Sequence, residues 1–169
     1  MVFRQGRSLK IAFGSLDCPE INQGIAYFVA SHIPGCTRGF ESYTTMGVIK
    51  DDQLIAGVVY SNFFPETGVI ELSAASTSRL WLTRPVLNAM FGYPFDQLGC
   101  QICVLRVSER NERMIRILHR FGFGSVRIPR LRGSDEAEII FTLTDDAWRS
   151  SRFNPANRKV QAARTASRR

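Results

Sequence analysis

The sequence predicts an α/β (α+β) domain of seven strands and three helices, in the order β-α-β-β-β-α-β-α-β-β. Three observations support this. The chain has 169 residues, 44% of them hydrophobic, which is enough for one compact core. Runs rich in β-branched residues alternate with segments whose apolar residues recur every three to four positions. Short turns separate neighbouring runs, so several strands can pair with the next strand along the chain.

The N-terminal half contains one predicted helix among four predicted strands. Pro19 follows Asp17 at a helix first turn, and the apolar stripe of that helix ends near residues 33–35. A short turn at residues 51–52 favours an antiparallel hairpin. The predicted strands of this half are residues 8–13, 44–50, 53–63 and 69–75.

The C-terminal half alternates helices and strands. Ser108 or Asn111 could cap the second of its helices by accepting a bond from an orphan backbone N–H group. Gly122 is placed to end that helix in a left-handed conformation. The predicted helices are residues 83–98 and 111–121, and the predicted strands are residues 101–107, 124–129 and 138–143.

The most specific pattern lies in residues 101–123, QICVLRVSERNERMIRILHRFGF. Asn111, Leu118, Gly122 and Phe123 stand where the GNAT superfamily of N-acetyltransferases has Asn-x-x-(small)-x-x-x-(Tyr or Leu)-x-x-x-Gly-Phe. The preceding residues, YPFDQLG, are similar to those of ribosomal-protein-acetylating and phage-encoded members. The chain therefore resembles a GNAT acetyltransferase of this branch, over about residues 8–148.

This resemblance implies a mixed central sheet that splays between strands 4 and 5, with the pantetheine arm of acetyl-CoA in the gap. It implies that the side chain of Asn111 bonds the pantetheine arm, and that the backbone N–H groups of Leu72, Ser73 and Ala74 polarise the thioester carbonyl. Acetyl-CoA would be the co-substrate, and the acetyl group would pass directly to an amine of a small molecule, a protein N-terminus or a lysine. The variable segments Gly35–Tyr43 and Arg130–Ala137 would build the acceptor pocket.

The resemblance also places a phosphate-binding loop, (Gln or Arg)-x-x-Gly-x-(Gly or Ala), on residues 79–84. Arg79 matches, whereas Leu82 and Arg84 replace the glycines that let a backbone approach phosphate closely. Arg79 and Arg84 could compensate by bidentate contacts, beside a helix that begins near Thr83. The alternative is that both arginines are solvated. Trp81 is the aromatic residue most expected to be functional, because it lies in this loop.

Two residues are the candidates for proton transfer. Glu71 lies within the fourth predicted strand and could take the proton of the amine, directly or through water. The alternative is that it is a solvent-facing acid. Leu118 stands where the family often has a tyrosine as general acid, so Ser108 is the candidate for that role. His119 is another nearby candidate, although a lone histidine on such a helix is more often an exposed surface residue.

The net charge is concentrated at the C-terminus. Residues 149–169 hold seven cations and no acid, which equals the whole net charge of +7. We expect a GNAT-like domain over residues 1–148 and a basic, disordered tail over residues 149–169. The tail allows a second hypothesis. According to this hypothesis, the chain is a catalytically weak acyl-CoA-binding protein, and its tail tethers it to nucleic acid or the ribosome by non-specific contact.

The remaining expectations concern location and assembly. No run of 18 apolar residues occurs, and the first residues lack the pattern of a secretory signal, so we expect a cytoplasmic protein with no membrane partner. Four cysteines are too few for a disulfide framework, and their spacing does not predict a metal site. We expect a monomer or a homodimer.

Overall fold

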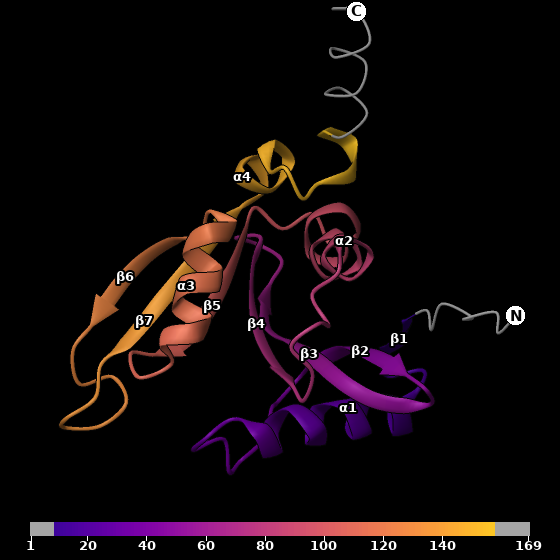
Figure 1. Cartoon of the computed structure of the whole chain (residues 1–169), viewed down its shortest axis with the longest axis horizontal. Helices are drawn as coiled ribbons and strands as arrows, with labels where there is room; N and C mark the ends of the chain where they lie inside the picture. Colours follow the sequence, from indigo (N-terminus) through magenta and orange to yellow (C-terminus); the bar gives the residue numbers. More distant parts are fainter. Residues whose placement is uncertain (1–8, 158–169) are drawn as a thin grey trace, which may run out of the picture. The chain divides into compact units, whose positions relative to one another are not determined.

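The computed structural model describes residues 9–157 (Figure 1). Its elements follow the predicted order and add a short helix at the end. They are β1 (Lys10–Gly14), α1 (Pro19–His32), β2 (Thr44–Lys50), β3 (Gln53–Phe64), β4 (Val69–Ser76), α2 (Arg84–Gly92), the π-helix η1 (Tyr93–Gln97), β5 (Ile102–Ser108), α3 (Glu112–Phe121), β6 (Gly124–Ile128), β7 (Glu138–Thr144) and α4 (Asp145–Ser150). Residue 8, the predicted start of the first strand, lies outside the described residues.

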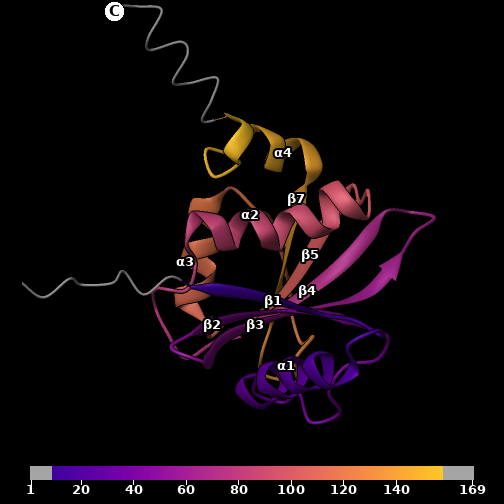
Figure 2. The same ribbon diagram turned by 90° about the vertical axis from the view of Figure 1, so that its right-hand side faces the viewer.

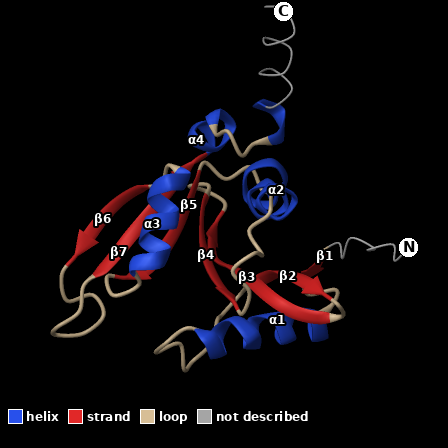
Figure 3. Ribbon diagram, in the orientation of Figure 1, coloured by secondary structure: helices blue, strands red, loops and turns tan. Residues whose placement is uncertain are grey.

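The strands form a seven-stranded sheet in the order β1-β2-β3-β4-β5-β7-β6. β4 and β5 pair in parallel, whereas β1 with β2, β2 with β3, β5 with β7 and β6 with β7 pair antiparallel. Figure 3 shows how the strands alternate with helices along the chain. The mixed α+β fold with a central sheet of seven strands is therefore confirmed.

The described chain divides into two compact units, and each is described by itself. The first unit contains residues up to 62 together with residues 73–86, and the second contains residues 63–72 together with residues from 87 onward.

In the first unit, α1 packs along the sheet formed by β1, β2 and β3, as both Figure 1 and Figure 2 show. Ile25, Val29 and Val59 are the centre of its core. Gly57 allows this close packing, because a Cβ atom there would lie only 2.7 Å from Cγ2 of Val29. In the first unit, α1 is therefore packed closely against these strands.

The core of the second unit is largely aromatic. Phe91 lies between several other rings, with Trp148 at 5.1 Å and Phe121 at 5.3 Å between ring centroids. Trp148 belongs to α4, a helix that the sequence reasoning missed, and is 1% exposed. Phe153, beyond α4, stacks on Phe121 at 4.7 Å between ring centroids. These contacts tie the chain after β7 to the rest of the unit.

The helix predicted at residues 83–98 is not one continuous α-helix. α2 ends at Gly92 and continues as the π-helix η1. Proline has no backbone N–H group, so Pro94 cannot donate the bond that an α-helix requires at that position. The backbone bonds instead shift to a wider turn, in which the N–H group of Leu98 donates to the carbonyl oxygen of Tyr93 at 3.1 Å.

The predicted boundary between domain and tail stays a prediction. Of the tail, residues 149–157 are described, and they include the end of α4 and the stacked Phe153. Residues 158–169, which hold five of the seven cations of the tail, lie outside the described residues.

Candidate functional site

The start of α3 is capped by Asn111. Its Oδ1 atom accepts a hydrogen bond from the backbone N–H group of Met114 at 3.1 Å. Its Nδ2 group donates to no other residue in the described part of the chain, and so is available to a ligand. At the other end, Gly122 has a φ angle of 102°, and the carbonyl oxygen of Leu118 accepts from the N–H groups of both Gly122 and Phe123.

The pairing between β4 and β5 is short. The register joins three pairs, Val69 with Ile102, Ile70 with Cys103 and Glu71 with Val104. β5 continues to Ser108, and all of its residues, 102–108, pair with β7 on its other side. Glu71 is therefore the last residue of β4 that pairs with β5. Its side chain is half-buried.

Ser108, at the end of β5, belongs to a polar network. Its hydroxyl donates a hydrogen bond to the carboxylate of Glu136 and accepts one from the backbone N–H group of Arg110 at 3.1 Å. The guanidinium of Arg110 also pairs with Glu136 at 3.4 Å. The side chain of Ser108 is thus fixed by two partners, and it does not cap α3.

Glu138 is the centre of a second, more buried pair of ionic contacts. It is 2% exposed, although it is charged. Its Oε2 atom accepts from Nε and Nη2 of Arg106 at 2.9 and 2.7 Å, and its Oε1 atom accepts from Nε of Arg132 at 2.9 Å. The hydrogen bond to Glu138 raises the pKa of Arg106. The sequence reasoning missed Glu138, because a strand pattern alone does not show which acid is buried beside arginines.

Glu109 forms a third contact of this kind, at the edge of the same unit. It accepts from the backbone N–H group of Ala137 at 2.8 Å and from Nε and Nη2 of Arg127 at 2.9 and 2.6 Å. These bonds, first that of Ala137 and then that of Arg127, hold the pKa of Glu109 below its ordinary value. The segment between β6 and β7 is thereby fastened to the end of β5.

The loop after β4 lies in the first unit, and it uses several of its own N–H groups. The N–H group of Ser78 donates to Oγ of Ser76 at 3.0 Å, and that of Leu80 donates to Oγ of Ser78 at 3.3 Å. The N–H group of Thr83 donates to the carbonyl oxygen of Trp81 at 2.8 Å. Three N–H groups are therefore not available to phosphate, in keeping with the loss of the glycines at positions 82 and 84.

The side chains of this loop divide into one buried and two exposed groups. Trp81 is 6% exposed, so it supports the loop from inside rather than facing a ligand as expected. Arg79 is exposed and forms no ion pair with any of residues 9–157. Arg84, the first residue of α2, is also exposed.

The candidate residues belong to different units. The candidates of the second unit are Glu71, Leu72, Ser108 and Asn111. Within this unit, Glu71 lies on β4 and Ser108 lies on the adjacent strand β5. The candidates of the first unit are Ser73, Ala74, Arg79, Thr83 and Arg84. His119, the alternative acid, is exposed, with the edge of its ring against Phe141 at 5.2 Å between centroids.

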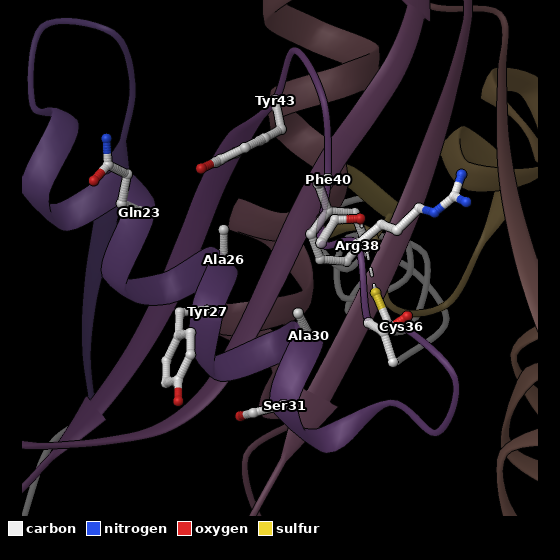
Figure 4. A pocket seen from close by; sticks show the side chains of 11 residues that line it. Gln23, Ala26, Tyr27, Ala30, Ser31, Cys36, Arg38, Phe40 and Tyr43 are labelled. Atoms are coloured by element: carbon white, nitrogen blue, oxygen red, sulfur yellow. Dashed lines mark hydrogen bonds between the residues drawn. The ribbon is translucent and has the colours of Figure 1, made fainter.

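A pocket of about 400 Å³ lies in the first unit, between α1 and the segment 36–43 (Figure 4). Ala26 and Ala30 of α1 and the ring of Phe40 lie at its centre, whereas the side chain of Arg38 points away from the helix. The lining contains no acidic residue. It consists of Gln23, Ala26, Tyr27, Ala30, Ser31, Cys36, Thr37, Arg38, Gly39, Phe40 and Tyr43.

Cys100 and Cys103 are both buried in the second unit. Burial raises the pKa of each thiol, and for Cys103 the neighbouring Cys100 raises it further. Burial therefore favours the protonated thiol of each residue, which is less nucleophilic than the thiolate.

Solved structures resemble this chain closely enough to define its fold. A spermidine/spermine N-acetyltransferase from Vibrio cholerae matches 84% of this chain and 96% of its own at 13% identity, with a TM-score of 0.65. A probable GNAT-family acetyltransferase from Chromobacterium violaceum matches 65% and 63% at 20% identity, with a TM-score of 0.55. This chain has the fold of the GNAT acetyltransferases.

Two further structures with this fold bear on substrates. A candidate acetyltransferase from Salmonella typhimurium, solved with its cofactor acetyl-CoA, matches 82% of this chain and 94% of its own at 16% identity, with a TM-score of 0.60. The ribosomal-protein-S5-alanine acetyltransferase from Vibrio fischeri matches 63% of each chain at 19% identity, with a TM-score of 0.53. The alignment with one probable acetyltransferase spans only 62% of that protein. No family model and no curated sequence matches the chain.

Among the described residues, no helix combines the length and the apolar character that crossing a bilayer requires.

Proposed function

We propose that this protein transfers an acetyl group from acetyl-CoA directly to a primary amine. One observation carries the proposal. The chain has the fold of acetyltransferases, and within that fold a capped helix, α3, follows β5 and presents the free amide group of Asn111. This amide could donate to a carbonyl of the pantetheine arm, while its oxygen stays bound to the helix.

The chemistry would divide between β4 and β5. Glu71 would accept a proton from the ammonium group, so that the neutral nitrogen can attack the thioester carbonyl. The N–H groups of Leu72, Ser73 and Ala74 would stabilise the negative charge on the carbonyl oxygen. As the new C–N bond forms and the C–S bond breaks, the nitrogen would release its second proton to solvent. The departing sulfur would receive a proton from Ser108, which solvent then restores.

The pyrophosphate of CoA would be held mainly by side chains. Three backbone N–H groups of the loop after β4 already donate within the loop, so the glycine-based cradle is incomplete. Arg79 and Arg84 would supply positive charge instead, with Thr83 beside the start of α2. This arrangement predicts a salt-sensitive affinity for the cofactor.

For the acceptor, we favour an amine without further positive charges. The pocket beside α1 has an aromatic and small-residue lining and no carboxylate, whereas a polycation such as spermidine requires acids to offset its charge. An amine on an apolar or aromatic group fits better, and a protein N-terminus that begins with alanine is the corresponding macromolecular acceptor.

Two measurements on the full-length chain test the proposal. Calorimetry should detect acetyl-CoA binding well below millimolar concentration, which corresponds to an affinity stronger than about −4 kcal/mol. Release of CoA should be stimulated by an alanine-initiated peptide more than by spermidine, and the variant Glu71→Gln should bind acetyl-CoA but lose this stimulation. An absence of binding at millimolar acetyl-CoA would rule out the enzyme.

A further inference from the structure

One face of the sheet in the second unit carries a line of charged side chains. Residues that pair across strands share a face, and so do residues two apart on one strand. Glu71 pairs with Val104, Arg106 follows two residues after Val104, and Ser108 pairs with Glu138. Glu71, Arg106, Ser108 and Glu138 therefore all lie on the same face, on three adjacent strands.

The opposite face is apolar. Cys103, Phe141 and Leu143 alternate with this line and are buried. Phe141 contacts the ring of His119 of α3, so α3 covers that side. The charged line is therefore not part of the hydrophobic core, and we examine it for an electrostatic role.

Arg106 occupies the middle of the line and is fixed at one end. Two of its five N–H bonds go to Glu138, whose side chain is only 3% exposed and is also held by Arg132 at 2.9 Å. The side chain of Arg106 is 45% exposed, so its other N–H groups are not shut into the protein. A buried carboxylate thus fixes the position of a guanidinium that reaches the surface.

Glu71 and Arg106 act on each other electrostatically. The pKa of Arg106 is raised chiefly by the hydrogen bond to Glu138, and to a smaller extent by the charges of Glu138 and of Glu71. Glu71 and Arg106 are also diagonal neighbours on adjacent strands, because Val104 pairs with Glu71 and Arg106 follows two residues later on the same face. The other charged groups near the line are Arg132 and Glu138, which pair with each other, and Glu136 with Arg110 at the end beyond Ser108.

We propose that Arg106 is a positioning residue for Glu71, held in place by Glu138 and Arg132. Its guanidinium holds the Glu71 carboxylate in one orientation, ready to receive the proton of the acceptor amine. This inference rests on the proposed function, because it assigns Glu71 the role of the base. It adds a residue that the sequence pattern did not indicate, and it gives the buried Glu138 a reason to be charged.

The test compares three variants of the full chain. Arg106→Gln removes the charge, Arg106→Lys keeps it, and Arg127→Gln is the matched control. Arg127 also donates Nε and Nη2 to one glutamate oxygen, at 2.9 and 2.6 Å, but its partner is Glu109 rather than Glu138. With an alanine-initiated peptide as acceptor, Arg106→Gln should lower kcat about 10- to 100-fold with little change in KM for acetyl-CoA. Arg106→Lys should recover part of the loss, and Arg127→Gln should stay near the parent.

A second readout does not depend on turnover. In protein labelled with 13C at glutamate carboxyls, Glu71→Gln identifies the resonance of Glu71. At neutral pH this resonance should shift in Arg106→Gln, because the neighbouring guanidinium has been removed. In Arg127→Gln it should stay in place. If Arg106→Gln does not fold, the same comparison is made with Arg106→Lys, in which the resonance should also shift because a compact ammonium replaces the planar guanidinium.

The possible outcomes distinguish failure of the proposed acetyl transfer from failure of the positioning role of Arg106. If the parent protein turns over neither the peptide nor spermidine, the proposed function fails, while the Glu71 resonance still tests the interaction of Arg106 with Glu71. If turnover is present and Arg106→Gln changes neither kcat nor the Glu71 resonance, the positioning role is wrong. Equal losses of kcat in Arg106→Gln and Arg127→Gln would also overturn it, since they would indicate a general loss of structure.

Discussion

Ser108 and Glu136, which are 28 residues apart in the chain, are joined by a hydrogen bond from the serine hydroxyl to the glutamate carboxylate. The bond connects the end of β5 to the segment before β7. It also means that the single hydroxyl proton of Ser108 is donated to Glu136 before substrate binds, so the proposed acid has to turn this proton away from Glu136 to protonate the leaving sulfur.

Substituting Ser108 tests the proposed acid directly. Ser108→Ala should lower kcat by about 100-fold, a typical contribution of a general acid, whereas Ser108→Thr keeps a hydroxyl and should retain most of the activity. The measurement is CoA release under saturating acetyl-CoA. An unchanged kcat in Ser108→Ala would indicate that solvent protonates the sulfur.

Asn111 has two roles that two substitutions can separate. Asn111→Ala removes the cap of α3 and should reduce the free energy of unfolding by about 1 kcal/mol. Asn111→Asp keeps an oxygen for the N–H group of Met114 but loses the amide donor. It should be as stable as the parent in urea denaturation, while its affinity for acetyl-CoA should fall by about 3- to 10-fold in calorimetry. Equal affinity in Asn111→Asp and the parent would exclude the proposed contact with pantetheine.

Two glycine substitutions should change stability in opposite directions. Gly122 has a φ angle of 102°, so Gly122→Ala should destabilise the protein by about 1 kcal/mol or more. Gly24 lies within α1, and a Cβ atom there would meet nothing within 4 Å, so Gly24→Ala should stabilise it by about 0.5–1 kcal/mol. Urea denaturation measures both. A neutral Gly122→Ala would mean that α3 can end in another conformation.

Glu138 should be costly to neutralise. Glu138→Gln leaves the guanidinium groups of Arg106 and Arg132 without their carboxylate, and because both are partly exposed we expect a loss of about 2–3 kcal/mol rather than the full cost of a buried pair. Asp135 is the control, since it also pairs with an arginine but is highly exposed. Asp135→Asn should change the free energy of unfolding by less than about 0.5 kcal/mol. Similar losses of stability in Glu138→Gln and Asp135→Asn would contradict the greater contribution assigned to the buried Glu138.

Glu109 should give the protein a recognisable dependence on pH. Its pKa is lowered in the folded protein, so its contribution to stability is present above the ordinary value of 4.5 and is lost as the pH falls through the lower, folded value. The difference in free energy of unfolding between the parent and Glu109→Gln should therefore be constant near neutral pH and shrink below pH 4.5. In Arg127→Gln, which lacks the hydrogen bond and the charge of Arg127, this difference should be smaller near neutral pH, and its loss should be complete at a higher pH. A difference that grows on acidification would contradict the assigned shift.

The sequence predicted the elements best where the pattern was local. The hairpin of β2 and β3 was placed at its observed bounds within one residue, because alternation and a two-residue turn define it by themselves. The start of α3 was narrowed to two residues, and the choice between them depended on contacts that no local pattern shows. Asn111 caps the helix, whereas Ser108 donates its hydroxyl to Glu136.

The features that were missed depend on contacts between distant segments or on a single backbone bond. Glu138 is buried because Arg106, 32 residues earlier, turns toward it. The π-helix η1 follows from one absent N–H group at Pro94, which a period-based pattern does not register. Trp81 was expected to be functional because it lies in a loop, and its side chain is buried. The roles of Glu71, Ser108 and the arginines of the loop stay predictions.

The hydrogen bond between Asn111 and Met114 also bears on what selection can preserve. A library randomised at position 111 and selected only for folded protein should retain asparagine, aspartate, serine and threonine, since each can begin a helix. The same library selected for acetyl transfer should retain asparagine alone. The frequency of asparagine at position 111 in each selection would show how far this residue is required for helix capping and how far for acetyl transfer.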